Sequence, residues 1–176
     1  MNTSAALAFG LCLIAGSALA DGLTIPLNRV DSSGIGTSVG SIQVSDGPDG
    51  LVLAPKLTGL PPGPHGFHVH EFPSCAPKEQ DGKSVPALAA GGHFDPDKTG
   101  AHRGPFESGH RGDLPALVVA ADGTAGSPLL APHLKLSDLR GHALMIHAGG
   151  DSYTDQPLPL GGGGARLACG VVPAAQ

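Results

Sequence analysis

Most of the nine histidines in this chain stand where they could bind a metal ion. The stretch HGFHVHEFPSC begins at His65 and places His68 and His70 two residues apart. Side chains alternate between the two faces of a strand, so these two imidazoles would point to the same side, about 7 Å apart. Phe67 and Val69 would then face the core. Such a pair is half of a metal site, and alone it is weak evidence of one.

The segment that follows supplies further donors, in the order His93, His102, His110 and Asp113. Three imidazoles and one carboxylate make a chemically sensible tetrahedral zinc set, because the carboxylate offsets part of the charge of the dication. His147 is distant in the sequence, but it ends an apolar stretch that could pair beside the first two histidines.

Six histidines and one aspartate are too many ligands for a single metal ion. Two adjacent sites would use them all. A site made only of histidines suits copper, and a site of histidines and a carboxylate suits zinc. The residue types therefore predict a centre with two metals.

Strands and turns must position these side chains. Short segments with β-branched or alternating apolar residues recur at residues 23–28, 38–46, 50–57, 65–72, 116–123, 142–148 and 166–172. Turns rich in Gly, Pro and Asp separate them, no sustained 3.6-residue period occurs, and SDLRGHAL has room for one helical turn. The sequence therefore predicts an all-β fold, a Greek-key β-barrel or sandwich of about eight antiparallel strands.

Two long segments interrupt this pattern. Residues 73–114 contain three of the candidate ligand histidines, one cysteine and many prolines, with almost no apolar periodicity. Residues 148–165 are rich in glycine and proline. Long segments without regular structure inside a compact domain are usually functional, so we expect two functional loops. A disulfide at the start of the first loop and a metal ion in its middle would hold it in place.

The composition limits the classes of function. A formal net charge of −5 argues against a nucleic-acid-binding protein that acts through bulk positive charge, and against a basic membrane-surface protein. It does not exclude a small anionic substrate, because local charge can differ in sign from the net charge. With 28 glycines, 17 prolines and only 14% charged residues, the chain fits a turn-rich β fold better than disorder.

The first twenty residues, MNTSAALAFGLCLIAGSALA, are apolar and contain no Asp, Glu, Lys or Arg. This pattern is typical of a secretory signal with an A-x-A cleavage site. We expect residues 1–20 to be removed after about Ala20, and residues 21–176 to form one domain. A membrane anchor is the alternative, although the run is short for one. Lipidation at Cys12 is a weaker alternative, because the preceding residues match a lipobox poorly.

Cleavage would leave two cysteines, Cys75 and Cys169. Two cysteines in an exported protein favour one disulfide, and two free buried thiols are the alternative.

With the donors and cysteines in this order, the chain resembles the copper/zinc superoxide dismutases, in particular the bacterial periplasmic form. The matching stretches are GFHVHEFPSC, GGHFDP, GHRGDLP and HAGGDSYTDQPLPLGGGGARLACGVV, and the resemblance extends from about Asp21 to the end. It implies the copper ligands His68, His70, His93 and His147. It implies the zinc ligands His93, His102, His110 and Asp113, so that His93 would bridge the two metals.

The resemblance also implies roles for residues outside the ligand sets. Cys75 and Cys169 match the disulfide of the family, and Arg166 matches the arginine beside copper. Asp151 matches the aspartate that links a copper ligand to a zinc ligand. Arg166 would attract the anion, and His93 would carry a proton.

The implied reaction converts two superoxide anions and two protons into oxygen and hydrogen peroxide, with copper cycling between oxidation states and zinc structural. The implied location is the periplasm. We expect superoxide as substrate, no nucleic-acid partner and no stable membrane insertion after cleavage. A homodimer is one of the assembly states that the sequence allows.

The remaining histidines have simpler interpretations. His65 lies at odd spacings from both ligands of its strand, so it would face away from them and make structural hydrogen bonds. His133 and His142 fall outside any ligand cluster. Lys78 and Lys83 follow the first cysteine and are candidates for lining a substrate channel.

Two other functions are compatible with parts of the pattern. A cupin-like enzyme with one metal also carries His-x-His on a barrel strand, but with a glutamate several residues later, whereas Glu71 follows His70 directly. A metal-holding or binding domain of the same fold would typically lack some ligands or the arginine, and this chain keeps them all.

Overall fold

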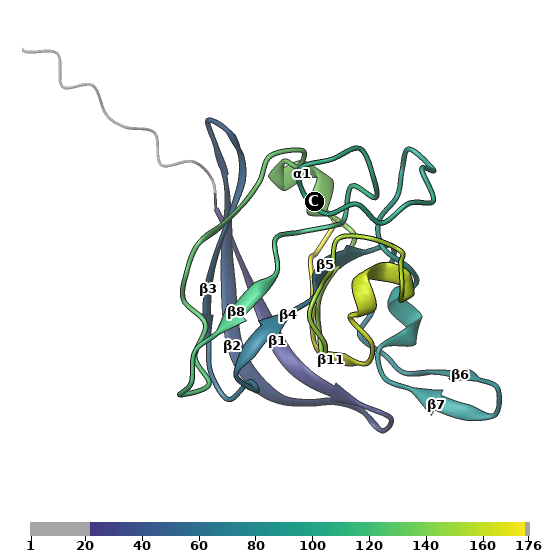
Figure 1. Cartoon of the computed structure of the whole chain (residues 1–176). Helices are drawn as coiled ribbons and strands as arrows, with labels where there is room; N and C mark the ends of the chain where they lie inside the picture. The colour runs from purple at the N-terminus through teal and green to yellow at the C-terminus, as the bar shows by residue number, and fades with distance from the viewer. Residues whose placement is uncertain (1–21, 175–176) are drawn as a thin grey trace, which may run out of the picture.

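The computed structural model describes residues 22–174, which form an all-β protein (Figure 1). The elements are β1 (Leu23–Asp31), β2 (Gly34–Gly47), β3 (Gly50–Leu57), β4 (Gly63–His65), β5 (Phe67–His70), β6 (Lys78–Gln80), β7 (Lys83–Val85), η1 (Leu88–Ala90), β8 (Leu117–Val119), β9 (Leu129–Ala131), α1 (Leu136–Leu139), β10 (Ala143–His147), η2 (Pro159–Gly162) and β11 (Arg166–Val171).

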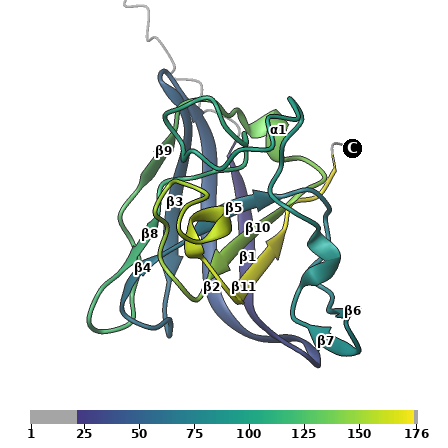
Figure 2. The same cartoon turned by 45° about the vertical axis from the view of Figure 1, so that its right-hand side comes forward.

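Seven of these strands form one curled antiparallel sheet in the order β5-β10-β11-β1-β2-β3-β9 (Figures 1 and 2). Two further pairs, β4 with β8 and β6 with β7, complete the strands. Strands distant in the sequence are neighbours, β1 beside β11 and β5 beside β10, as long Greek-key connections produce. The predicted all-β class is confirmed, although the strands are more numerous than the sequence pattern predicted. β1 and β2 are longer than predicted, and β8 is shorter.

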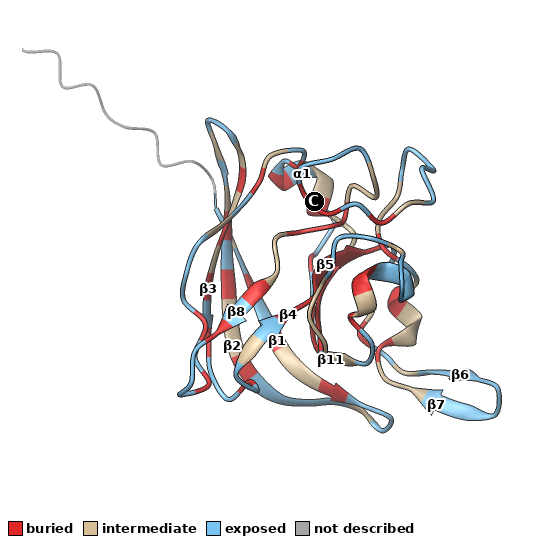
Figure 3. Ribbon diagram, in the orientation of Figure 1, coloured by how far each residue is buried: buried red, intermediate tan, exposed pale blue. Residues whose placement is uncertain are grey.

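The core lies against the inner face of the curled sheet and is mainly aliphatic. β3 shows how the sequence builds it, because Leu51, Leu53 and Leu57 alternate with more exposed residues and are buried (Figure 3). Phe67 and Val69 are fully buried in the same cluster, as predicted for the residues that alternate with the histidines of β5.

The first long segment covers the free edge of β5. The Val69 amide donates to the carbonyl of Gly112 over 2.9 Å, and the Phe94 amide donates to the carbonyl of Val69 over 2.8 Å. Two isolated bridges extend this pairing, joining His70 to His93 and β5 to Asp113. The backbone groups of the edge strand are thus satisfied within the chain, and two candidate ligands are brought alongside the first two.

A hairpin that the sequence pattern did not predict interrupts this segment. β6 and β7 are largely exposed and project from the body of the protein (Figure 3). Because neither face of the hairpin is buried, its residues have no alternating apolar pattern to detect. β9 was also missed, because its three residues are too few to show an alternating pattern. The predicted helical turn is present as α1.

A disulfide joins Cys75, at the start of the first long segment, to Cys169 in β11, with the Cα atoms 5.8 Å apart. The predicted pairing is confirmed. No helix among residues 22–174 is both long and apolar enough to cross a membrane. The predicted signal, residues 1–20, lies outside the described residues.

Candidate metal centre

Three histidines, which we call the strand-borne group, stand on paired strands: His68 and His70 on β5, and His147 on β10. The two strands pair antiparallel, and the His147 amide donates to the carbonyl of Gly66 over 2.8 Å. The rings lie on the face opposite the core. They are nevertheless buried, between 0% and 6% exposed, under the two long segments.

Hydrogen bonds fix which nitrogen two of these rings offer. His70 Nδ1 lies 3.0 Å from the carbonyl oxygen of Gly91, and His147 Nδ1 lies 3.1 Å from that of Gly164. A carbonyl can only accept, so in a neutral ring the proton is on Nδ1 and Nε2 is a bare acceptor. The two Nε2 atoms are 3.3 Å apart. Two facing lone pairs at this distance suit a shared cation.

The loop-borne group consists of His93, His102, His110 and Asp113. Its imidazoles converge on one carboxylate oxygen, Asp113 Oδ1, which lies 2.9 Å from His93 Nδ1, 2.9 Å from His102 Nδ1 and 3.5 Å from His110 Nδ1. His93 is placed by its pairing with β5, and Asp113 by the return of the same segment along that edge.

Three buried nitrogens in these groups have no hydrogen-bond partner: Nδ1 of His68, His102 and His110. His102 Nδ1 is close to the carboxylate, but not in hydrogen-bonding geometry. An unpaired buried acceptor is costly, and a metal ion lying along the lone pair of such a nitrogen would satisfy it. The donor set therefore fits bound metal in both groups, with imidazole alone on one side and a carboxylate added on the other.

The two groups share a residue. The ligand atoms of His68, His70, His93 and His147 all lie within 4.8 Å of one another, and so do those of His68, His93, His102 and Asp113. His93 stands in both sets, as a bridge requires. The second set contains His68 where the sequence resemblance placed His110, whose nitrogen lies slightly farther out.

Asp151 connects the two groups. Its Oδ2 lies 2.8 Å from His68 Nε2, and its Oδ1 lies 2.7 Å from His102 Nε2. Each bond occupies the nitrogen that faces away from the ligand cluster and leaves Nδ1 directed inward. This is the position at which the resemblance implied a linking aspartate.

The two groups differ in the charge that surrounds them. Burial lowers the pKa of His68 to about 3 and that of His147 to about 4. Burial alone would also lower the pKa of His102, but the carboxylates of Asp113 and Asp151 raise it to about 9. Burial would raise the pKa of Asp113, yet its contacts with the histidines hold it well below its usual range.

Arg166, at the start of β11, lines a small cavity of about 240 Å³ together with His70, His93 and His147. Its Nη1 donates to the carbonyl of Ala87 over 2.5 Å, and its Nη2 donates to that of Gly91 over 2.6 Å. These bonds hold a guanidinium, which stays charged, beside the ligand cluster.

Sequence reasoning missed several groups that hold the site. The carboxylate of Asp155 accepts from the His102 amide over 2.9 Å, and the hydroxyl of Tyr153 accepts from the Ala116 amide over 2.8 Å. The carbonyls that orient Arg166 were also missed. The polar stretch DSYTDQ was a signal that this loop makes contacts, but the sequence does not name the partners, because most of them are backbone atoms.

The remaining predictions have plain outcomes. His65 is buried and makes two hydrogen-bonding contacts of 2.8 Å, from Nδ1 to the His147 carbonyl and from Nε2 to the Pro61 carbonyl. His142 lies against Phe94, with ring centroids 4.2 Å apart. Both lysines proposed for the channel stand on the exposed β6–β7 hairpin and do not line the small cavity.

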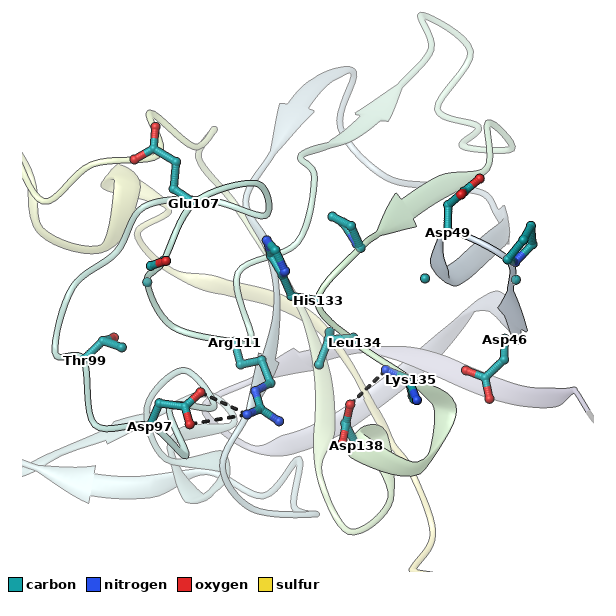
Figure 4. Close-up of a pocket in the computed structure, with 16 residues that line it drawn as sticks. Asp46, Asp49, Asp97, Thr99, Glu107, Arg111, His133, Leu134, Lys135 and Asp138 are labelled. Atoms are coloured by element: carbon teal, nitrogen blue, oxygen red, sulfur yellow. Dashed lines mark hydrogen bonds and ion pairs between the residues drawn. The ribbon is translucent and has the colours of Figure 1, made fainter.

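A larger cavity of about 1110 Å³ lies between the β2–β3 turn, the first long segment and α1 (Figure 4). Among its charged side chains, Arg111 pairs with Asp97 at 3.0 Å, and Asp138 accepts from the Lys135 backbone amide. None of the candidate ligands lines it. The chemistry of this protein therefore belongs to the smaller cavity.

An all-β scaffold with two histidine groups that share one residue defines a protein with a two-metal site. Comparisons with known proteins name its family. The profile described as copper/zinc superoxide dismutase (SODC) matches residues 38–172. The chain therefore belongs to the copper/zinc superoxide dismutase family, which sets aside the cupin-like alternative.

Individual relatives are similar over most of the chain. "Superoxide dismutase [Cu-Zn] 1" of Salmonella typhimurium is 63% identical over 91% of this chain and 92% of the relative. The copper/zinc superoxide dismutase structure from Brucella abortus has a TM-score of 0.85 at 52% identity, covering 86% of this chain and 99% of that one. The monomeric enzyme from Salmonella enterica has a TM-score of 0.78 at 51% identity, covering 86% and 99%.

Proposed function

We propose that this chain dismutes superoxide at the shared histidine centre. Two superoxide anions and two protons become one oxygen molecule and one hydrogen peroxide molecule, one anion being oxidised and the other reduced. The observation that carries the proposal is the position of His93, whose ring belongs to both ligand groups.

We assign copper to the strand-borne group with His93, and zinc to His93, His102, His110 and Asp113. Copper would supply reversible one-electron chemistry, and zinc would fix the structure without changing its oxidation state. For four of the histidines, the ligand nitrogen follows from the bond that occupies the other nitrogen of the ring: His68, His70, His102 and His147.

His93 moves a proton in this scheme. Its Nδ1 faces Asp113, so Nε2 is the atom that takes up a proton in the first half-reaction and returns it in the second. Arg166 binds the anion, because its guanidinium is held in the same cavity and offers donors in a fixed fork.

Charge reversal at Arg166 tests the proposal. At about 5 Å and an effective dielectric of ~20–80, each unit charge contributes roughly 1–3 kcal/mol. Arg166→Glu should therefore lower dismutation on the order of ten- to several-hundred-fold at low salt. Arg166→Lys keeps the positive charge but not the forked set of donors, so its dismutation activity should fall moderately. Equal activity of all three forms, with both metals verified by metal analysis, would remove Arg166 from the mechanism.

We also propose that residues 1–20 direct export to the periplasm and are removed, leaving residues 21–176 as the mature domain. The disulfide supports this, because such bonds persist in oxidising compartments. The amino-terminal sequence of the protein recovered from the periplasm tests it, and an intact leader or a cytoplasmic location would contradict it.

The assembly state belongs to the same proposal. A homodimer stays a prediction of the sequence, while the Salmonella enterica neighbour is described as monomeric. Light scattering of the metal-loaded protein distinguishes the two states.

A further inference from the structure

His142 stands where the two strands that carry the strand-borne histidines separate. β5 and β10 lie side by side (Figure 2), and their antiparallel pairing ends at the pair His70 and Ala143. The next residue along β5, Glu71, donates its amide to the carbonyl of Gly92 in the first long segment over 3.1 Å. Backbone pairing between the two strands is therefore complete one residue before Glu71.

The side chain of His142 provides a donor at this point. Its Nδ1 lies 2.7 Å from the carbonyl oxygen of Glu71 and 3.2 Å from that of His70. A carbonyl oxygen can only accept, so this nitrogen carries a proton and donates to both oxygens. A neutral ring and a charged ring can both make this bond. The imidazole thus extends the link between the strands by one residue, with a side-chain N–H in place of a backbone N–H.

The ring of His142 is itself held from two sides. The His142 amide donates to the carbonyl of Leu139 at the end of α1 over 3.2 Å, and the His142 carbonyl accepts from the Val172 amide over 2.9 Å. The imidazole lies against the ring of Phe94, with the centroids 4.2 Å apart and the planes inclined by 45°. A donor that is fixed in this way can fix the carbonyls that it binds.

The two contacts of this imidazole reach the chain beside two different ligands. Glu71 directly follows His70, and Phe94 directly follows His93. The Phe94 amide also donates to the carbonyl of Val69 over 2.8 Å, where the first long segment joins the edge of β5. The rings of His70 and His93 have their centroids 5.2 Å apart. One side chain therefore links the backbone just after each of these two ligands.

We propose that His142 is a positioning residue for the copper site, whose Nδ1–H fixes the end of β5 while its ring supports Phe94, so that His70 and His93 can hold one metal ion. His142 belongs to neither ligand group and does not line the small cavity, so it acts through the backbone. This inference rests on the proposed function, because it uses the assignment of copper to the strand-borne group with His93.

Removal of the donor tests the proposal on the protein loaded with copper and zinc. His142→Phe keeps a ring beside Phe94 but has no side-chain N–H. We expect its dissociation constant for copper to rise about tenfold, and that for zinc to rise less than about threefold. The parallel hyperfine splitting in the electron paramagnetic resonance spectrum of Cu(II) should also differ from that of the wild type, because His70 can then shift relative to His93.

Two further variants at this position separate the donor from the ring. His142→Asn places an amide nitrogen the same number of bonds from the backbone as Nδ1, so it can donate to the same carbonyls. Its Cu(II) spectrum should match that of the wild type, with a copper dissociation constant within about threefold. His142→Ala lacks both donor and ring and adds no bulk. It should behave like His142→Phe, and it replaces that variant if the larger ring prevents folding.

Ile25→Val is the control for a general loss of stability. Ile25 is buried in the core on β1, and the substitution removes one methyl group without contact to the ligands. Its unfolding in urea should be shifted to a lower concentration, while its Cu(II) spectrum and copper dissociation constant stay those of the wild type.

Three outcomes would overturn the proposal: wild-type copper affinity and spectrum in His142→Phe and His142→Ala, a loss in His142→Asn as large as in these variants, or the same spectral change in Ile25→Val. Dismutation by the metal-loaded wild type is measured separately. A wild type that binds copper but does not dismute superoxide would refute the proposed function alone, and one that binds no copper would refute both.

Discussion

The two ligand groups occupy one centre but are positioned by different means. The strand-borne histidines stand on β5 and β10, whose register is fixed by backbone pairing. The loop-borne residues stand in a segment that depends on the edge of β5, on one disulfide and on the carboxylates of Asp151 and Asp155. Regular structure places the first group, and individual contacts place the second.

Their electrostatics differ in the same way. His68 and His147 are held neutral by burial, whereas His102 is held charged by two carboxylates when no metal is bound. The pKa of histidine is thus shifted in opposite directions within one cluster. The protonation state of the strand-borne group is therefore set by exclusion of water. That of the loop-borne group is set by the carboxylates paired with its histidines.

Removing the disulfide should produce the largest difference in metal release between the two groups. The bond closes a sequence separation of 94 residues, and the chain-entropy estimate for such a loop is about 4–5 kcal/mol. We expect Cys75→Ser with Cys169→Ser to lose stability of this order and to release zinc to a chelator much faster than copper. Urea unfolding and timed metal analysis measure both. Unchanged zinc release would show that the edge pairing alone holds the loop-borne group.

Acidification of the metal-free protein should act on the strand-borne group. A histidine whose folded-state pKa is depressed binds protons more readily when unfolded, so its contribution to stability is lost as pH falls below about 6.5. For His68 and His147 together we expect a loss of about 3 kcal/mol between pH 6.5 and 5.

The contribution of His102 to stability changes with pH in the opposite direction. Its folded-state pKa is raised, so its contribution is full below about pH 6.5 and is lost as pH rises through 9. Urea unfolding of the metal-free protein across this range tests both signs. A stability that does not change between pH 6.5 and 5 would contradict the burial argument for the strand-borne group.

Asp151→Asn should weaken the connection between the groups. An amide can accept from one histidine only, so one of the two rings loses its orienting bond. We expect zinc affinity to fall about 10–100-fold and copper affinity to fall less, because His70 and His147 are oriented independently. Competition titration with chelators measures both. Asp122→Asn, in a distant turn, is the control, and equal losses of both metals would contradict the prediction.

Tyr153→Phe should have the smallest effect. It removes one hydrogen bond from the Ala116 amide and keeps the ring, at a cost of about 1 kcal/mol. Zinc release should be slightly faster and copper release unchanged. Phe106→Leu, at an exposed aromatic residue of the first long segment, is the control. An effect as large as that of Asp151→Asn would mean that the loop has no other support.

The difference between the groups also decides what the sequence could predict. The period of two in the stretch around β5 was enough to place His68 and His70 on one face and Phe67 in the core. The donors of the loop-borne group could be grouped as a zinc set from residue type, but only the family resemblance implied that His93 belongs to both sets. No periodicity describes a loop that pairs along a strand edge.

The backbone atoms that hold the site could not be predicted from the sequence, for a related reason. The carbonyls of Ala87 and Gly91 orient Arg166, and every residue carries a carbonyl, so the sequence does not distinguish these two. The hairpin β6–β7 was missed because both of its faces are exposed. Prediction succeeded where burial imposes a pattern and failed where single contacts decide.

Tyr153 has a consequence for how this protein is observed. It is the only tyrosine, and the chain contains no tryptophan. Intrinsic fluorescence therefore originates in the loop that clamps the ligand segment, and circular dichroism in the far ultraviolet originates mainly in the strands. The two signals report opening events of different size. Denaturation curves from them that do not coincide would reveal a partly unfolded state in which the loop has lifted from an intact sheet, so unfolding would not be two-state.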